Sequence, residues 1–407
     1  MGFSVKQECP QCGGPVELDE TDHILQCPYC DVKSFLFSDE PFRFVLPHKT
    51  QKKAILYVPY LRFRGVAYAC HARKVAHRII DITRLAVPLK RFPMSLGLRP
   101  QAMKMRFVSR ETEGAFLKRF LRTDEMLAPV EKQSSAAISD EIYHRAYVGE
   151  AINLIYLPLY IEKGVLLDAI THHPVARLPK ERQKFSSITE HSPWNLTFLA
   201  TLCPRCGWNL EGQRDSVVLV CKNCQTAWEA QRGKFIPVDF RVVSDDHPGV
   251  TYLPFWKMSV RTEGLAINSF ADFIRVTNQP KVIQKSWHNQ GMMFWAPAFK
   301  IRPKLFLAIS RRLTLAQKNP EGQEEFPDQK RHPATLPLAE AIQGIKLTLA
   351  HSTVNKKEIL PRLPEINMAV KGATLMYLPF NQTAHEMIQP HTGLAINKKS
   401  LEFGRYL

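Results

Sequence analysis

The 407-residue sequence lacks an apolar run long enough to cross a bilayer. Its longest apolar run, residues 151–161, contains a proline and is about half the roughly 20 residues that a membrane-spanning helix needs. The segment Met1-Gly2-Phe3-Ser4-Val5-Lys6 has no apolar signal stretch, and lysine stands where a myristoylation motif has Ser or Thr. We therefore expect a cytoplasmic protein without a transmembrane segment or lipid anchor.

The sequence also lacks the common catalytic motifs. It contains no GxxxxGK[ST] phosphate loop, no GxSxG nucleophile elbow and no HExxH metal helix. Two histidine-containing pairs remain, His172-His173 and Cys70-His71. Neighbouring histidines point in different directions on most backbones, so we expect a turn at the first pair and not a metal site. Adjacent residues in a strand face opposite sides, so we expect a buried, unreactive thiol at Cys70 and not a nucleophile activated by His71. The sequence thus predicts no catalytic residue, no organic cofactor site and no enzyme.

Acidic residues are scarce in two segments of this chain of net charge +17. Residues 43–122 contain 19 Lys and Arg against three acidic residues, and residues 234–318 contain 13 against five. Residues 1–42 show the reverse, with two basic and eight acidic residues. A basic segment can bind nucleic acid, an anionic membrane surface or an acidic protein, or it can form a solvated face. The candidate anion or nucleic-acid contacts are Lys52, Lys53, Arg62, Arg64, Arg73, Lys74, Lys90 and Arg91.

Eight of the nine cysteines form two copies of one pattern. Each copy has two CxxC pairs separated by 14 residues, and the copies are 194 positions apart. Two residues between thiolates allow a tight metal-binding knuckle, and the glycines that follow, Gly13 and Gly207, can take the positive φ that this knuckle needs. Four thiolates make a closed tetrahedral shell, which predicts structural Zn²⁺ at each site. The alternatives are two disulfides per cluster or reduced core cysteines.

The cysteine pattern resembles the zinc-ribbon family. The resemblance covers about 35 residues of each copy and implies two short β-hairpins that clasp one zinc ion. It assigns two structural Zn²⁺ ions to the ligands Cys9, Cys12, Cys27 and Cys30, and Cys203, Cys206, Cys221 and Cys224.

Shorter motifs extend the repetition beyond the cysteines. Tyr57-Val58-Pro59 follows Cys9 by 48 residues, and Tyr252-Leu253-Pro254 follows Cys203 by 49. This spacing indicates a tandem duplication whose halves meet near residues 186–194. The predicted parts are a zinc ribbon at 1–40, a β-hairpin and helix body at 41–190, a second ribbon at 195–235 and a second body at 236–407.

Four apolar runs with Tyr, an aliphatic residue and Pro, each followed by Gly, predict β-hairpins at 55–70, 155–169, 250–267 and 375–397. Proline removes a ladder donor, so we expect Pro59, Pro158, Pro254 and Pro379 at edges or bulges. The repeated tyrosines are interpreted as core residues. Helical periodicity predicts helices at 336–350 and 303–317. The fold class is therefore α+β and β-rich.

The two cysteine clusters together with Tyr252-Leu253-Pro254-Phe255 and Tyr377-Leu378-Pro379-Phe380 resemble a group of bacterial cytoplasmic proteins with tandem zinc ribbons. The first half departs from this pattern at Tyr57-Val58-Pro59-Tyr60. The resemblance implies an accessory or scaffold role. We expect a non-enzymatic scaffold that docks protein partners in a cytoplasmic assembly. The alternative is a nucleic-acid-binding protein that uses segments 43–122 and 234–318.

Overall fold

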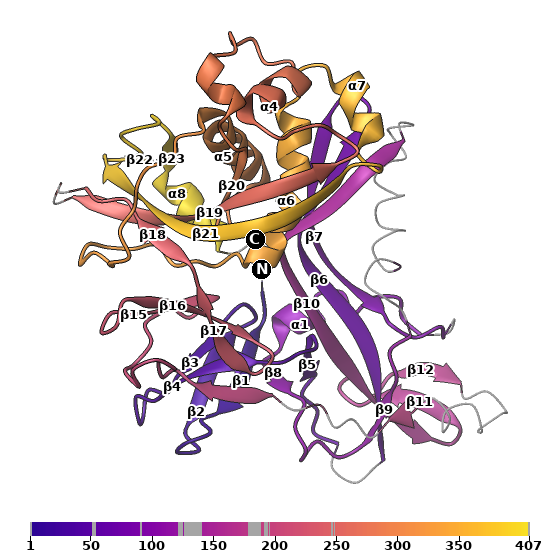
Figure 1. The fold of residues 1–407 in the computed structure, drawn as a ribbon. Helices are drawn as coiled ribbons and strands as arrows, with labels where there is room; N and C mark the ends of the chain where they lie inside the picture. The colour runs from indigo at the N-terminus through magenta and orange to yellow at the C-terminus, as the bar shows by residue number, and fades with distance from the viewer. Residues whose placement is uncertain are drawn as a thin grey trace. The chain divides into compact units, whose positions relative to one another are not determined.

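The computed structural model describes residues 2–50, 54–89, 92–120, 125, 141–177, 189–190, 194, 196–245, 247 and 249–405. Strands predominate over helices in these residues, so the predicted β-rich class is confirmed (Figure 1). The chain divides into two compact units. Unit 1 comprises Met1–Arg64, Asp81–Ser139 and Ala151–Ala200, and unit 2 comprises Gly65–Ile80, Asp140–Glu150 and Thr201–Leu407. The predicted four-part division is finer than this and stays a prediction.

The strands of unit 1 belong mainly to one sheet, in the order β13-β9-β6-β10-β5-β8-β1-β2, with β11 and β12 following β10. Three long strands have residues in both units: β6 (Ile55–His71), β7 (Val75–Leu85) and β10 (Ile142–Glu162). The shorter strands are β1 (Ser4–Glu8), β2 (Pro15–Asp19), β5 (Phe42–Val45), β8 (Met105–Phe107), β9 (Ala115–Leu117), β11 (Val165–Asp168), β12 (Pro174–Arg177) and β13 (Thr189–Glu190).

The first cysteine cluster lies within this architecture. β1 pairs with β2 and also, in parallel, with β8, so the first ribbon is part of the large sheet of unit 1. Its second hairpin, β3 (Ile24–Gln26) and β4 (Lys33–Phe37), forms a separate small sheet with β14 (Thr197–Ala200). The short helix α1 (Arg99–Ala102) begins at a proline-containing turn. The ribbon is therefore held by both sheets of unit 1.

Unit 2 contains a six-stranded sheet and a three-stranded one. The larger has the order β20-β19-β21-β22-β23, and β18 pairs in parallel with β21. The smaller, β15-β16-β17, carries the second cysteine cluster. The strands are β15 (Val218–Cys221), β16 (Thr226–Gln231), β17 (Lys234–Val238), β18 (Phe240–Val242), β19 (Val250–Glu263), β20 (Met293–Pro297), β21 (Asn367–Gln382), β22 (Glu386–Ile388) and β23 (Ala395–Asn397).

The two predicted helices are confirmed and pack against the larger sheet of unit 2 (Figure 1). α5 (Pro303–Ala316) begins at a proline and ends at Gln317, whose left-handed backbone caps it. α6 (Leu338–Ser352) buries Ala341, Ile345 and Leu349 at helical spacing. The remaining helices are α4 (Phe270–Val276), α7 (Lys356–Ile359), α8 (Lys398–Gly404) and the 3₁₀ turns η1 (Lys285–His288) and η2 (Leu360–Arg362).

Two of the four predicted hairpins are present and two are wrong. β10 and β11 form the hairpin at 155–169, and β21 and β22 form one at 375–397. In contrast, β6 continues through Gly65 and β19 continues to Glu263 before the chain leads to α4. A Cβ on Gly65 would lie 2.9 Å from Cα of Glu150. Gly65 thus permits the close approach of two backbones within a strand. From the sequence alone, such a glycine cannot be told apart from a glycine that marks a turn.

The tyrosine and proline motifs lie in the core. Tyr252, Leu253 and Pro254 of β19 pair with Pro379, Leu378 and Tyr377 of β21, and all four motif tyrosines are buried. Pro254 does not lie at the expected edge or bulge: β19 runs between β20 and β21, and the carbonyl of Pro254 accepts from the N–H of Ala298 at 3.0 Å, one residue beyond β20. The interpretation of these tyrosines as packing residues is confirmed.

Candidate metal centres

The eight predicted ligands come together as two four-cysteine clusters. In each cluster the four sulfur atoms lie within 4.8 Å of one another. In the first, Sγ of Cys9 is 3.7 Å from Sγ of Cys30, and Sγ of Cys12 is 3.6 Å from Sγ of Cys27. In the second, the two corresponding distances, Cys203 to Cys224 and Cys206 to Cys221, are 3.5 Å each.

These distances fit a metal ion better than they fit disulfides. A disulfide joins its sulfurs at about 2.0 Å, so none of these pairs is bonded. Four sulfurs about 2.3 Å from one zinc ion lie about 3.8 Å apart, close to what both clusters show. Each group can therefore hold one metal ion, and an all-thiolate donor set suggests zinc.

The knuckle backbone explains how the local sequence builds each site. The N–H of Gly13 donates to the carbonyl of Cys9, and the N–H of Gly207 donates to the carbonyl of Cys203, at 2.9 Å in both knuckles. Both glycines have φ of +73°. The second knuckles place non-glycine residues at the same point, Asp31 and Gln225, with φ of +55° and +51°. Sequence reasoning identified the glycines and missed these two.

Polar neighbours position the thiols of the second cluster. The indole Nε1 of Trp228 donates to Oγ1 of Thr226 at 2.8 Å, and that oxygen lies 3.2 Å from Sγ of Cys224. A hydrogen bond with Asn223 is the main reason that the pKa of Cys206 is lowered to about 6. Burial raises the pKa of Cys221 to about 12. Metal ligation requires thiolates, so a divalent cation here would release the remaining thiol protons.

An exposed aromatic ring accompanies each cluster. Tyr29, within the second knuckle of the first site, is 67% exposed, and its ring covers Gly14. In the second site the position equivalent to Tyr29 holds Asn223, and the position equivalent to Gly14 holds Trp208, which is 60% exposed. The aromatic residue thus comes from opposite knuckles in the two sites. The cysteine pattern alone did not single out these rings.

The two histidine-containing pairs lie where ordinary structure accounts for them. His172 occupies a turn with φ of +60°, and its Nδ1 lies 3.2 Å from the hydroxyl of Tyr160. His173 is exposed beside it. Cys70 is fully buried, and burial raises the pKa of its thiol to about 12. A thiol with so high a pKa is a poor nucleophile.

The predicted anion contacts fall into three groups. Arg73 and Lys74 are exposed at the turn between β6 and β7. Arg62 and Arg64 are only 2% and 4% exposed, and both pair with Glu20, so they do not present the free surface charge that the prediction assumed. The remaining four lie outside the described residues: Lys52, Lys53, Lys90 and Arg91.

Acidic residues from elsewhere in unit 1 neutralise part of the basic segment 43–122. Nζ of Lys104 lies 2.7 Å from a carboxylate oxygen of Glu17, and Arg43 lies 2.7 Å from Glu40. Arg99 pairs with Asp168. Glu17, Glu20 and Glu40 all belong to the acidic segment 1–42. The opposite charges of the two segments therefore serve in part to bind them together.

The described structure thus defines a β-rich protein with two four-cysteine clusters consistent with tandem zinc-ribbon-like sites. No family model, curated protein or solved structure matches the chain. None of the helices in the described residues is long and apolar enough to cross a membrane.

Proposed function

We propose that this chain is a non-enzymatic accessory protein that binds two structural zinc ions and docks protein partners in a cytoplasmic assembly. Zinc fits the all-thiolate donor sets and the sulfur spacing. A closed four-ligand shell leaves no coordination position for a substrate, which favours a structural role over a catalytic one.

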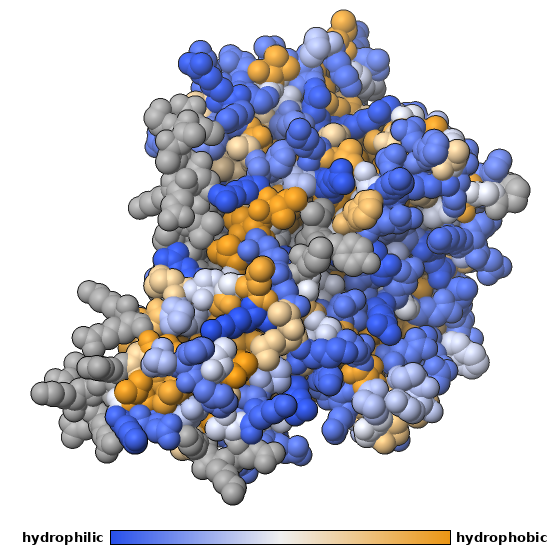
Figure 2. Space-filling view, turned by 180° about the vertical axis from the view of Figure 1, so that it is seen from behind, coloured by the Kyte–Doolittle hydropathy of each residue, from blue (hydrophilic) through white to orange (hydrophobic). Residues whose placement is uncertain are grey.

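The carrying observation is the exposed aromatic ring beside each cluster. Tyr29 and Trp208 are each more than half exposed, although large aromatic residues are usually buried for the most part. Tyr and Trp are the residues most enriched among those that dominate protein interfaces. Leu202, also exposed, adds apolar surface near Trp208 in sequence. On the face drawn in Figure 2, apolar residues reach the surface in patches among hydrophilic ones.

We also propose that the chain arose by tandem duplication. In unit 1 the strand after the ribbon, β5, runs parallel to β10 and pairs Val45 with Tyr156. In unit 2 the strand after the ribbon, β18, runs parallel to β21 and pairs Val242 with Tyr377. The motif tyrosine has the same kind of partner in both units, which supports the repeat read from sequence.

Photo-crosslinking in cells tests the docking role. With p-benzoylphenylalanine at position 29 or 208, we expect adducts with a discrete protein, because these rings would lie in the interface. Trp208→Ala should weaken capture of the same protein about tenfold or more, the loss typical of an interface hot spot. The matched control positions are Phe120 and Phe403, aromatic residues that are also exposed. Equal adducts at control and test positions, or none at either, would contradict the proposal.

Binding to nucleic acid distinguishes the docking proposal from the nucleic-acid alternative. Several cations of segment 43–122 pair with carboxylates, so under the docking proposal we expect only weak binding of duplex or single-stranded DNA and RNA, which is lost near physiological salt. A salt titration of the zinc-loaded protein checks this, with Arg73→Glu and Lys74→Glu combined as the variant. Affinity tighter than micromolar, with a steep salt slope that the variant reduces, would favour the alternative over docking.

A further inference from the structure

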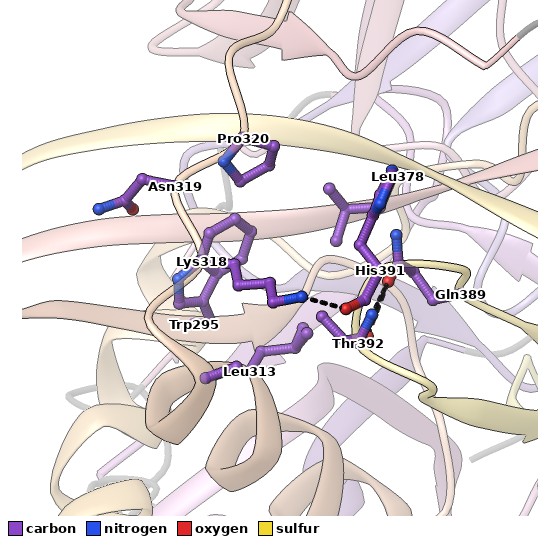
Figure 3. Close-up of a pocket in the computed structure, with 10 residues that line it drawn as sticks. Trp295, Leu313, Lys318, Asn319, Pro320, Leu378, Gln389, His391 and Thr392 are labelled. Carbon is purple, nitrogen blue, oxygen red and sulfur yellow. Dashed lines mark hydrogen bonds between the residues drawn. The ribbon is translucent and has the colours of Figure 1, made fainter.

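A cavity of about 340 Å³ in unit 2 lies beside the C-terminal end of α5 (Figure 3). Its wall combines residues of α5, of the segment that follows this helix, of β20 and β21, and of the loop after β22. The lining residues are Trp295, Leu313, Ala316, Lys318, Asn319, Pro320, Leu378, Gln389, His391 and Thr392. Its volume falls in the range of small-molecule sites.

Most of the cavity wall is apolar and fixed by surrounding contacts. Trp295, Leu313 and Leu378 are buried side chains that face this space. The backbone N–H of Trp295 donates to Oγ1 of Thr314 at 3.0 Å. Gln317, which ends α5, donates through Nε2 to the carbonyl of Thr314 at 2.7 Å. The wall is therefore largely formed before any ligand arrives, which lowers the entropic cost of binding.

Lys318, a lysine without a carboxylate partner in the described residues, lines the same space, and Arg312, outside the lining, holds the loop that carries Thr392. Nζ of Lys318 donates to the backbone carbonyl of His391 (Figure 3), and Arg312 donates to the carbonyls of Thr392 and Gly393 at 3.0 and 2.8 Å. No Asp or Glu is among the lining residues, and in the described part of the chain neither Lys318 nor Arg312 forms an ion pair. A lysine ammonium has three donors, so its bond to His391 leaves two for a ligand.

We propose that this cavity binds a small carboxylic acid with an apolar body. The body would lie against Trp295, Leu313 and Leu378, and the carboxylate would meet Lys318. The charge selects an anion, and the walls select an aromatic or aliphatic group over a sugar or a phosphate. This site is independent of the docking role of Tyr29 and Trp208, because it shares no residue with either cysteine cluster.

Ligand-observed ¹⁹F NMR on the full-length, zinc-loaded protein tests the proposal. The probes are 4-fluorobenzoate and its neutral counterpart 4-fluorobenzamide, with phenylacetate and hexanoate as competitors. We expect the acid to bind with a dissociation constant below about 1 mM and the amide about tenfold more weakly, because a charge-assisted hydrogen bond is lost. Lys318→Met should weaken acid binding about tenfold and leave amide binding unchanged.

Two further variants separate the cavity from the general surface. Ala316→Phe should fill the space and abolish binding of both probes, whereas Lys285→Met, an exposed lysine outside the lining, should change neither. Unchanged amide binding in Lys318→Met also shows that the cavity remains formed. The proposal is overturned if none of the three acids binds below about 1 mM, if acid and amide bind equally, or if Lys318→Met has no effect.

Discussion

Replacing Cys9 and Cys12 together by serine should reduce the bound zinc from two ions per chain to one and unfold the first ribbon. Serine hydroxyls do not replace thiolates as zinc ligands, and the remaining Cys27 and Cys30 are too few for a structural site. Apparent binding free energies of structural zinc are about 10–16 kcal/mol, comparable with the whole stability of a domain. Loss of one ion is therefore a large perturbation.

The unfolding should extend beyond residues 1–40. β1 is continuous with the large sheet of unit 1 through its pairing with β8, and β4 pairs with β14. The equivalent change at the second site, Cys203 and Cys206 to serine, should be more local, because β15, β16 and β17 form a sheet of their own. The first pair of substitutions should therefore destabilise more of the chain than the second pair.

Metal content by mass spectrometry and hydrogen exchange by region provide the measurement. Cys70→Ser is the matched control, since Cys70 is the one cysteine that belongs to neither predicted ligand set. It should retain two zinc ions. If Cys9→Ser with Cys12→Ser also retains two, the first ligand set is incorrect.

Short-range patterns in the sequence predicted those features that local chemistry determines. The CxxC spacing placed all eight thiols in their clusters because a knuckle is built from adjacent residues. The helices α5 and α6 followed from periodicity and from Pro303. The turn predicted at Gly65 is absent. A glycine is needed there because the backbone of Glu150, 85 positions away in the sequence, lies against it, and a local pattern does not reveal that contact.

Charge counting failed for a related reason. Arg62 and Arg64 were counted as surface cations because they fall in a segment with few acids. Their counter-charge, Glu20, comes from the acidic ribbon, and no local pattern connects the two. The exposed rings of Tyr29 and Trp208 also require solvent exposure to be known before they stand out from other aromatic residues.

The pairing of Glu20 with two arginines leads to the second large expected effect. The carboxylate of Glu20 is completely buried, and it accepts hydrogen bonds from Arg62 at 2.9 Å, from Arg64 at 3.5 Å and from Asn153 at 3.1 Å. Burial alone would lower the pKa of Arg62, but the hydrogen bonds and charges of Glu20 and Asp81 more than offset this and raise it. The ion pairs compensate the cost of burying the guanidinium groups.

Glu20→Gln should therefore destabilise unit 1 by about 3–5 kcal/mol, because it preserves the shape of the side chain but removes the buried negative charge that Arg62 and Arg64 share. Arg62 keeps its second ion pair, with Asp81 at 2.8 Å. Hydrogen exchange at residues 55–64, within β6, reports this change as a lower opening free energy. The control is Glu17→Gln, which removes a solvent-exposed pair with Lys104 and should have little effect.

Charge compensation and packing can be distinguished with a combined variant. Glu20→Leu together with Arg62→Met and Arg64→Met removes all three charges and keeps most of the buried volume. Asp81, the second partner of Arg62, remains, and 27% of its side chain is exposed to solvent. If unpaired charge is the cause, the combined variant should recover much of the stability that Glu20→Gln loses, since apolar groups can replace a buried ion pair at little cost. Equal losses in both variants would instead assign the effect to the specific hydrogen bonds of Glu20. In that case the carboxylate would act as a geometric link between the acidic ribbon and β6, and its charge would be secondary.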